Sequence, residues 1–426
     1  MFKFLSIFFL GVCLNLHATT ILDLFEAINH QPISKLDNIH THIEKLAKDR
    51  SDAAYYPIVN GFAAYTHYNS PTNMRPVDPI SSSSLMADDQ SIPFSKTIEK
   101  FGVNFSVPIF MKELSDLSHK TEFLLQSSKL KKRLNYFQNE AIVLGANANL
   151  QYLENLISSL YATKQSILST KKRVEVGVDI GRTPIIVLDK LEEKLNQLDI
   201  SINNIKIKEL ELISTIENLT GIELKKSVSM QRVSSINKNE FFALKPLEKT
   251  ILASKSDLKA TKAKRYYPKV SLSAMWSENY ASHDVYKDDD VHVGYGYYEL
   301  GVLIPLYNKE EDVSIQLKKI AIMKNKMQLE KTKKEIKTTV KALEKNINLL
   351  EHSEKLNDIN IKKREKLLKY AKVAYEQGRM IEEDYLSYED KLLSAKANYF
   401  ETISQKWQSI AKLSVIYGND LKGIVR

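Results

Sequence analysis

The side chains that could do chemistry in this sequence gather in one acidic stretch. The segment IEEDYLSYED begins at Ile381, directly after the triplet Gly-Arg-Met at residues 378–380, and places Glu382, Glu383 and Asp384 side by side. If copies of these carboxylates converged on a narrow passage, they would attract cations and raise one another's pKa values. The same acids could instead lie in the first turn of a helix and complement its macrodipole. The sequence favours neither interpretation over the other.

Other groups of titratable residues are weak candidates for catalysis or metal binding. His40 and His42 are two positions apart on a predicted helix, so they point to different faces. The segment KDDDV (287–291) lacks the spaced ligands of a calcium loop and is better explained as a solvated hairpin tip. The sequence contains no G-x-S-x-G motif, no G-x-x-x-x-G-K-[ST] motif and no cluster of His and Cys. We therefore expect no enzyme, no metal site and no cofactor.

The N-terminus predicts export from the cytoplasm. A single Lys precedes an apolar run from Phe4 to Val12, and small residues follow, which is typical of a secretory signal peptide cleaved after Ala18. The run is too short to cross a bilayer as a helix. A lipoprotein signal with an acylated Cys13 is the alternative, although Val12 is bulky for the position before a modified Cys.

The composition points to long helices. Gly and Pro are scarce, at 13 and 11 in 426 residues, and 27% of the residues are charged. The formal net charge is +9, but no run of Lys and Arg is interleaved with aromatic residues. We attribute this charge to solvated helix faces and expect no nucleic-acid partner.

The sequence contains an internal duplication with a fixed offset. The tripeptide YYP occurs at residues 55–57 and again at 266–268, each time between a charged stretch and an alternating one. Further along, identical residues recur 197 positions apart: Pro108 and Pro305, Gly181 and Gly378, Arg182 and Arg379, Glu192 and Glu389, Lys194 and Lys391, Leu195 and Leu392, Gly221 and Gly418. A repeat of this length indicates two copies of one structural unit.

Each unit is predicted to contain two strands followed by two long helices. Alternation with period two predicts strands near 55–68, 99–110, 266–278 and 293–307. Heptad-like spacing of apolar residues predicts helices that pack side by side near 112–178, 184–220, 309–376 and 381–417. The predicted organisation is a signal peptide (1–18), a first repeat (19–221), an equatorial connector (222–245) and a second repeat (246–426).

The predicted strands have the length that crosses a bilayer at a tilt. In lipid, every backbone N–H and C=O must be paired, so the sheet must close on itself. Four strands are too few, because natural barrels begin at about eight. We therefore expect several copies to share one barrel. The YYP tripeptides would then lie at the water–lipid boundary, where a Tyr ring and its hydroxyl are both satisfied.

These features together resemble the TolC family of outer-membrane efflux factors. The resemblance is carried by the signal peptide, the duplicated units, the turns VDIGRTP and YEQGRM, and the helix end LTG. It implies a mainly α fold with a transmembrane β-barrel contribution: a homotrimer whose twelve-stranded barrel in the Gram-negative outer membrane continues as a long α-helical barrel in the periplasm. It also implies a passive exit duct that contacts outer-membrane lipid, a periplasmic adaptor (membrane fusion) protein and an inner-membrane transporter of the RND, ABC or MFS type.

The resemblance also assigns roles to the two helix turns. In the family these turns receive the adaptor, which implies docking at Val178, Gly181, Arg182, Thr183, Gly378, Arg379 and Met380. An acidic ring narrows the periplasmic mouth, with Asp at six and at nine positions after the turn Gly. Asp384 fits the first position, whereas Ser387 occupies the second, so that Glu383 is a candidate replacement. Arg182 or Arg379 is expected to pair with Asp384 and hold the mouth shut.

Two other functions stay open at this point. The first is the outer-membrane component of type I protein secretion, because the tube is shared and the pump selects the cargo. The second, of a different class, is a soluble periplasmic helical scaffold such as the adaptor itself. The two-strand unit before each helical hairpin argues against the scaffold, since adaptors enclose one hairpin within β domains.

Overall fold

The computed structural model describes residues 19–88, 93–281 and 290–426. The predicted signal peptide with Cys13 and residues 287–289 of the KDDDV segment lie outside the described residues. The helices are α1 (Ile21–Ala27), α2 (Pro32–Ala53), α3 (Pro79–Ala87), α4 (Lys112–Asp179), α5 (Ile185–Thr220), α6 (Lys245–Tyr266), α7 (Lys309–Glu376) and α8 (Glu382–Tyr417). The strands are β1 (Ile58–Asn73), β2 (Phe94–Met111), β3 (Lys269–Ala281) and β4 (Val291–Leu303).

The long helices reproduce the duplication. Helices α4 and α7 contain 68 residues each, and α5 and α8 contain 36 each. Their bounds keep the offset of 197 positions at both ends. Both α5 and α8 end at a glycine in the left-handed conformation, Gly221 and Gly418, each with φ of 71°. The chain is mainly helical with a small antiparallel sheet, and the predicted strand–strand–helix–helix unit is confirmed in both halves.

The YYP tripeptides lie at the two transitions from helix to strand. Helix α2 ends at Ala53 and β1 begins at Ile58, while α6 ends at Tyr266 and β3 begins at Lys269. Pro suits this place because it terminates a helix and is tolerated at the start of a strand.

The loop between β1 and β2 contains a short helix that the alternation pattern does not predict. Helix α3 is capped by Asp78, whose Oδ1 accepts hydrogen bonds of 2.9 Å from the backbone N–H groups of Ile80 and Ser81. The pair Asp78-Pro79 is a typical start signal for a helix.

Strand β4 ends at Leu303, earlier than expected, because Pro305 follows and has no N–H that could donate to a neighbouring strand.

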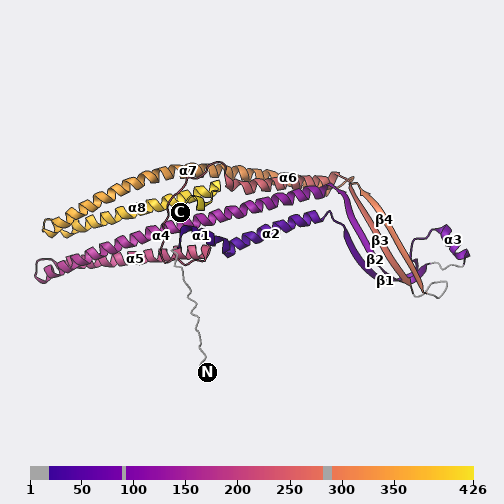
Figure 1. Ribbon diagram of the computed structural model, residues 1–426, viewed down its shortest axis with the longest axis horizontal. Helices are drawn as coiled ribbons and strands as arrows, with labels where there is room; N and C mark the ends of the chain where they lie inside the picture. Colours follow the sequence, from indigo (N-terminus) through magenta and orange to yellow (C-terminus); the bar gives the residue numbers. More distant parts are fainter. Residues whose placement is uncertain (1–18, 89–92, 282–289) are drawn as a thin grey trace, which may run out of the picture. The chain divides into compact units, whose positions relative to one another are not determined.

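The chain divides into two compact units. The first combines residues up to Ile39 with 130–245 and 331–426. Within it, α4 and α5 form one hairpin and α7 and α8 form another (Figure 1). Its largest apolar cluster joins α1, the middle of α4, the ends of α5 and α8, and the irregular residues after Thr220; its fully buried members include Leu24, Phe25, Leu144, Ile216 and Leu421.

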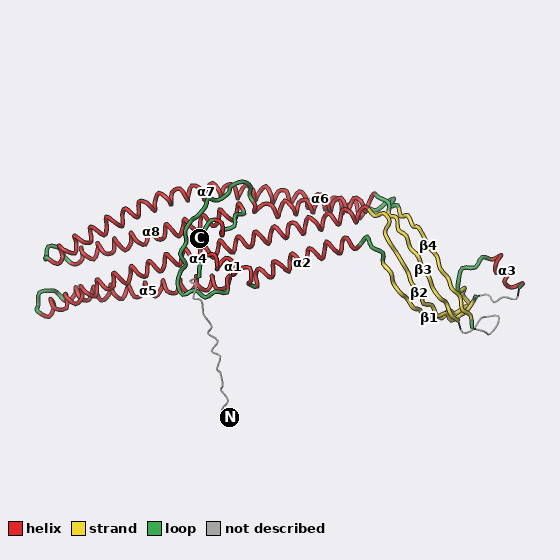
Figure 2. The backbone as a smooth tube through the Cα atoms, in the orientation of Figure 1, coloured by secondary structure: helices red, strands yellow, loops and turns green. Residues whose placement is uncertain are grey.

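The second unit comprises residues 40–129 and 246–330 and contains the sheet. Its four strands follow the order β1-β2-β3-β4, and every pair of neighbours is antiparallel (Figure 2). The two repeats meet at the central pair, where Val103 of β2 lies opposite Trp276 of β3.

Within residues 19–88, 93–281 and 290–426, no helix combines the length and the apolarity needed to cross a membrane.

Candidate functional site

The first helix turn is closed by a left-handed glycine. Gly181 has φ of 73°, a conformation that L side chains rarely adopt. The backbone N–H groups of Arg182 and Thr183 donate to the carbonyl of Gly177 at 2.8 and 3.0 Å. Pro184 then adopts an extended conformation and starts α5. The predicted docking residues Val178, Gly181, Arg182 and Thr183 therefore lie together in one tight reversal.

The second helix turn has the same backbone design. Gly378 has φ of 70°, and the N–H of Arg379 donates to the carbonyl of Ala374 at 2.8 Å. Ile381 takes the extended position before α8 that Pro184 holds before α5. Met380 lies in this turn, so the three docking candidates of the second repeat are also brought together.

The acidic residues lie in the first turn of α8, as the macrodipole interpretation requires. Glu382, Glu383 and Asp384 are all in this turn, where negative charge faces the positive end of the helix dipole. Glu383 is 82% exposed and lies 3.9 Å from the Nζ of Lys190 on α5. Within one chain, no ion pair joins Asp384 to Arg182 or Arg379 in the described ranges. The expected pairing of Asp384 with Arg182 or Arg379 is therefore not formed within one chain, and it stays a prediction for the assembled channel.

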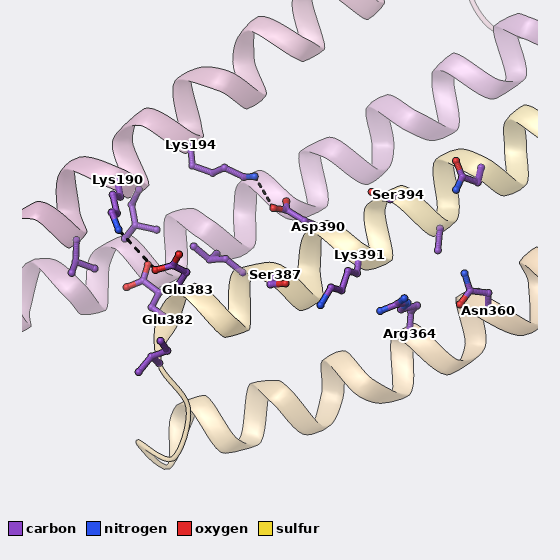
Figure 3. A pocket seen from close by; sticks show the side chains of 16 residues that line it. Lys190, Lys194, Asn360, Arg364, Glu382, Glu383, Ser387, Asp390, Lys391 and Ser394 are labelled. Atoms are coloured by element: carbon purple, nitrogen blue, oxygen red, sulfur yellow. Dashed lines mark hydrogen bonds and ion pairs between the residues drawn. The ribbon is translucent and has the colours of Figure 1, made fainter.

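A groove of about 890 Å³ opens beside this turn, between α5, α7 and α8 (Figure 3). Glu383 and Ser387 line it, so two of the three predicted aperture residues share one wall. An ion pair of 2.7 Å between Lys194 of α5 and Asp390 of α8 crosses the groove. Sequence reasoning missed this pair, because the partners are 196 positions apart and contact only after the hairpins pack.

An aromatic cluster links α4 to the second hairpin near the turns. The guanidinium of Arg173 on α4 lies over the ring of Tyr375 at 5.1 Å, and Tyr375 stacks on Tyr385 of α8 with centroids 5.1 Å apart. The side chain of Glu382 is half-buried, and its Oε1 has no hydrogen-bond partner among the residues that the structure describes. Burial raises the pKa of Glu382, while the charge of Arg173 opposes that rise.

A buried carboxyl group completes the contact between the hairpins. Glu389 of α8 is 6% exposed, and its Oε1 accepts hydrogen bonds from the hydroxyls of Tyr385, at 2.6 Å, and Ser166 of α4. Burial raises the pKa of Glu389, although both hydroxyl contacts act in the opposite direction. The sequence marked Glu389 only as a member of the repeat, since nothing in the local pattern reveals its burial.

One face of the sheet is apolar and exposed. Directly paired residues of an antiparallel sheet lie on the same face, so Val59, Phe105, Ala274 and Tyr298 form one row and Val103 lies beside Trp276 in the next. On this face Val103, Trp276 and Tyr298 are 48%, 57% and 86% exposed, while Phe105 and Ala274 are partly buried. An apolar surface of this kind is expected to contact a partner or lipid.

The opposite face of the sheet is more polar. The side chains of Asn60 and Asn104 are joined by a hydrogen bond of 3.1 Å. One row contains Ile58, Ser106, Ser273 and Glu299, and the neighbouring row contains Asn60, Asn104, Met275 and Tyr297. Strands β1 and β4 form the two edges, and no strand pairs with their outer sides in the part of the chain that the structure describes. The chain therefore presents a two-faced sheet with open edges.

Comparison with known proteins supports the fold. No family model and no curated protein matches the sequence. The outer-membrane channel CmeC of Campylobacter jejuni matches with a TM-score of 0.75 at 14% identity, over 95% of this chain and 85% of that one. The outer-membrane protein VceC of Vibrio cholerae matches with a TM-score of 0.74 at 13% identity, over 94% and 96% of the two chains.

The outer-membrane channel MtrE of Neisseria gonorrhoeae, solved in an open state, matches with a TM-score of 0.74 at 11% identity, over 95% of this chain and 90% of that one. The chain thus has the fold of the TolC-family outer-membrane channels, and the resemblance stated from the sequence is confirmed at the level of fold.

Proposed function

We propose that this protein is a passive outer-membrane channel that serves as the exit duct of a tripartite efflux pump. It works as a homotrimer in the outer membrane, with its helices in the periplasm. A periplasmic adaptor and an inner-membrane transporter supply the substrate, so the chain itself is not an enzyme. The fold that it shares with solved outer-membrane channels supports this proposal.

The observation that carries the proposal is the two-faced, open-edged sheet. In water the two rows that contain Trp276 and Tyr298 would leave a large apolar surface uncovered. In lipid that surface is satisfied, but the free N–H and C=O groups of β1 and β4 are then costly. Pairing β4 of one copy with β1 of the next satisfies both requirements. The polar rows that contain Asn104 and Ser106 then face the inside of the barrel.

The helices have unpartnered apolar surface that copies of the chain could cover. On α2, Ile33, Leu36, Ile39, Ile43 and Leu46 recur at intervals of three or four and are 40% to 56% exposed. Such a stripe is typical of a helix that packs against another helix. The part of the chain that the structure describes buries no residue of α2, so a neighbouring copy is the partner that we propose for it.

The helix turns are the proposed contact with the adaptor. Val178, Gly181, Arg182 and Thr183 and, in the second repeat, Gly378, Arg379 and Met380 form two similar reversals at the ends of the hairpins. Asp384, with Glu383, is the proposed acidic ring of the mouth in the trimer.

Two adjacent substitutions test the channel against a soluble scaffold. Val103 lies on the apolar face and Asn104 on the polar face of the same strand. We expect Val103→Asp to abolish heat-resistant oligomers in outer-membrane fractions, because a carboxylate facing lipid is costly. Asn104→Asp should preserve assembly and increase cation selectivity in planar bilayers.

Equal assembly of both variants would contradict the assigned faces. A wild-type chain that is monomeric in periplasmic extracts and carries no current in bilayers would exclude the channel and favour the scaffold. Deletion of the gene should sensitise cells to exported toxic compounds if the duct serves efflux, whereas a specific loss of a secreted protein would point to type I secretion.

A further inference from the structure

The contact among Ser166, Tyr385 and Glu389 joins two hairpins that are far apart in the sequence. Ser166 belongs to α4, whereas Tyr385 and Glu389 are one turn apart on α8. Besides the two hydrogen bonds to Glu389, the hydroxyls of Ser166 and Tyr385 lie 3.0 Å apart. Tyr385 is 3% exposed. Glu389 is 6% exposed, whereas Ser166 is only partly buried, and all three side chains line a small cavity. The carboxyl and phenol groups are therefore largely buried, and in such a site hydrogen bonds are strong and an unpaired charge is costly.

The carboxyl group of Glu389 is only partly satisfied. Its Oε2 is buried and has no hydrogen-bond partner within the described residues. Two hydroxyls that donate to the same oxygen do not replace the hydration that a full negative charge loses on burial. The neutral carboxyl group is therefore the form that this site accommodates best.

Charged groups from four helices surround the cluster without pairing with Glu389. A cavity of about 390 Å³ beside it is lined by Lys369 and Lys372 of α7 and by the ion pair between Glu365 and Lys396, which spans 3.3 Å. The neighbouring Asp390 is held by Lys194 of α5 at 2.7 Å. On α4, Arg173 lies over Tyr375. The field of Lys372 lowers the pKa of Glu389 and that of Asp390 raises it.

The matched glutamate of the first repeat has a different environment. Glu192 lies 197 positions before Glu389, is 51% exposed and forms an ion pair of 2.8 Å with Lys171 of α4. The residue that corresponds to Lys171 in the second repeat is Leu368. The second hairpin therefore has no lysine at this position to pair with its glutamate, and the carboxyl group is buried against the first hairpin instead.

We propose that Ser166, Tyr385 and Glu389 form a pH-sensitive latch that holds the α7–α8 hairpin against the α4–α5 hairpin, and that ionisation of Glu389 loosens this latch. Because burial raises the pKa of Glu389 above its value in a solvated chain, the latched state binds more protons than the loosened state. The latch is therefore tightest in acid and weakens as pH rises through the interval between the two pKa values.

The consequence for transport rests on the proposed function. Glu389 lies seven residues after Glu382, about 10 Å along α8 from its start at the rise of a regular helix. In a trimeric channel, release of α8 from α4 at this level would free the turn that bears Asp384 to move. A mouth that is held in acid and released at higher pH is the expected behaviour.

Spin labels at matched positions can measure the latch directly. Ile180 and Gln377 are exposed, lie at the two turns, and are 197 positions apart. We would label Ile180→Cys and Gln377→Cys in a full chain whose one cysteine, Cys13, is replaced by Ser. Diluting the labelled chains with a large excess of unlabelled chain keeps the measured distances within one protomer.

We expect the distance distribution to be narrow at about pH 5 and, at about pH 8, to broaden or shift by about 2 Å or more. Glu389→Gln, which cannot ionise, should stay narrow at both pH values. Glu192→Gln is the matched control and should respond like the wild type. Tyr385→Phe, which keeps the ring stack but removes the hydroxyl, should broaden the distribution already at about pH 5.

An unchanged distribution in the wild type, or an unaltered pH response in Glu389→Gln, would overturn the latch. Because the spectroscopic measurement does not depend on conductance, it separates the latch from the channel. A pH response of the hairpins without current in bilayers would support the latch and refute the proposed channel function. Current in bilayers without a pH response of the hairpins would support the channel function and refute the latch.

Discussion

The two helical hairpins have matching lengths but different interiors. Buried apolar residues in α4 and α5 form a seam with heptad-like spacing: Leu160, Ile167, Val174, Leu191, Leu195, Leu198 and Ile202. The residues 197 positions later in α7 and α8 are Asn357, Arg364, Ala371, Tyr388, Leu392, Ala395 and Tyr399. The two hairpins therefore share a backbone, but the positions of the aliphatic seam in the first contain mostly polar, aromatic and small residues in the second, with Leu392 as the exception.

The difference shows which contacts hold each hairpin. The first hairpin is stabilised by burial of large aliphatic side chains, which costs the most to undo. The second relies more on polar contacts, such as the 3.0 Å hydrogen bond between Asn357 and Thr402 and the contacts of Glu389 with the first hairpin. Regions with few buried apolar contacts open at lower free energy. We therefore expect α7 and α8 to separate from their neighbours before α4 and α5 separate from each other.

The largest expected effect comes from removing a side chain of the apolar seam. Ile167 is 1% exposed, so Ile167→Ala should lower the free energy of unfolding by about 2–5 kcal/mol. Arg364 is the matched residue of the second hairpin and is only half-buried. Arg364→Ala should cost less than about 1 kcal/mol. Urea midpoints of the two variants measure both losses of stability. Similar losses in the two variants would contradict the inference that the two hairpins are held by different contacts.

The two repeats also differ at the position of Glu140, where the first repeat buries a carboxyl group and the second repeat does not. Glu140 of α4 is fully buried, and its Oε2 accepts a hydrogen bond of 3.2 Å from the N–H of Leu421. The matched residue of α7 is the exposed Lys337. Burial first, and then the charge of Asp420, raises the pKa of Glu140 to about 8.

This raised pKa makes stability depend on pH. Between the solvated value near 4.5 and about 8 the folded chain binds the extra proton, so stability falls as pH rises across that interval. Glu140→Gln should remove a decline on the order of 3 kcal/mol between about pH 5 and about pH 8. Urea midpoints measured at several pH values would show a flatter profile. A variant with the wild-type slope would mean that Glu140 is charged throughout.

The sequence predicts the hairpins well because their signals are local and repeated. The offset of 197, the seam spacing and the glycines Gly181 and Gly378 together predict helices whose observed ends differ from the expectation by one residue at most. Helix α3 was missed, since a nine-residue helix within a polar insertion has too few turns to show a periodicity.

The candidate site was harder to predict because its contacts depend on packing between hairpins. Asp390 and Glu389 each contact residues about 200 positions away. Contacts between residues so far apart cannot be predicted from the spacing of residues in the sequence. Glu383 and Ser387 were named by their distance from a turn, and they do share one groove. The acidic ring of Asp384 stays a prediction, because its members belong to different copies.

The turns provide a contrast of intermediate size. Among the described residues of one chain, a Cβ added to Gly181 or Gly378 meets nothing within 4 Å, so the left-handed backbone is what opposes a substitution there. A Cβ added to Gly418 would lie 2.4 Å from atoms of Phe242. Gly181→Ala and Gly378→Ala should each cost about 1–2 kcal/mol, and Gly418→Ala should cost more because of the steric overlap. Thermal midpoints that rank Gly418→Ala lowest would support this order; equal midpoints would show that Phe242 moves aside.

The smallest expected loss of stability comes from breaking the ion pair that crosses the groove. This substitution also gives the most specific test of the difference between the two hairpins. Lys194 and Asp390 are 30% and 44% exposed, so Asp390→Asn should cost about 0.2–1 kcal/mol, and less at high salt. The matched control is Glu193→Gln, since Glu193 accepts a hydrogen bond of 3.1 Å from Gln197 of its own helix.

The same substitution should nevertheless move the pH response of the latch. The charge of Asp390 raises the pKa of Glu389, and its removal also leaves Lys194 unpaired near the cluster. Both changes favour the ionised form of Glu389, so the hairpins of Asp390→Asn should loosen at lower pH than those of the wild type. An unchanged pH response, read from the spin-label distances, would show that the field of Asp390 does not reach Glu389, and a shift to higher pH would contradict the assigned direction of that field.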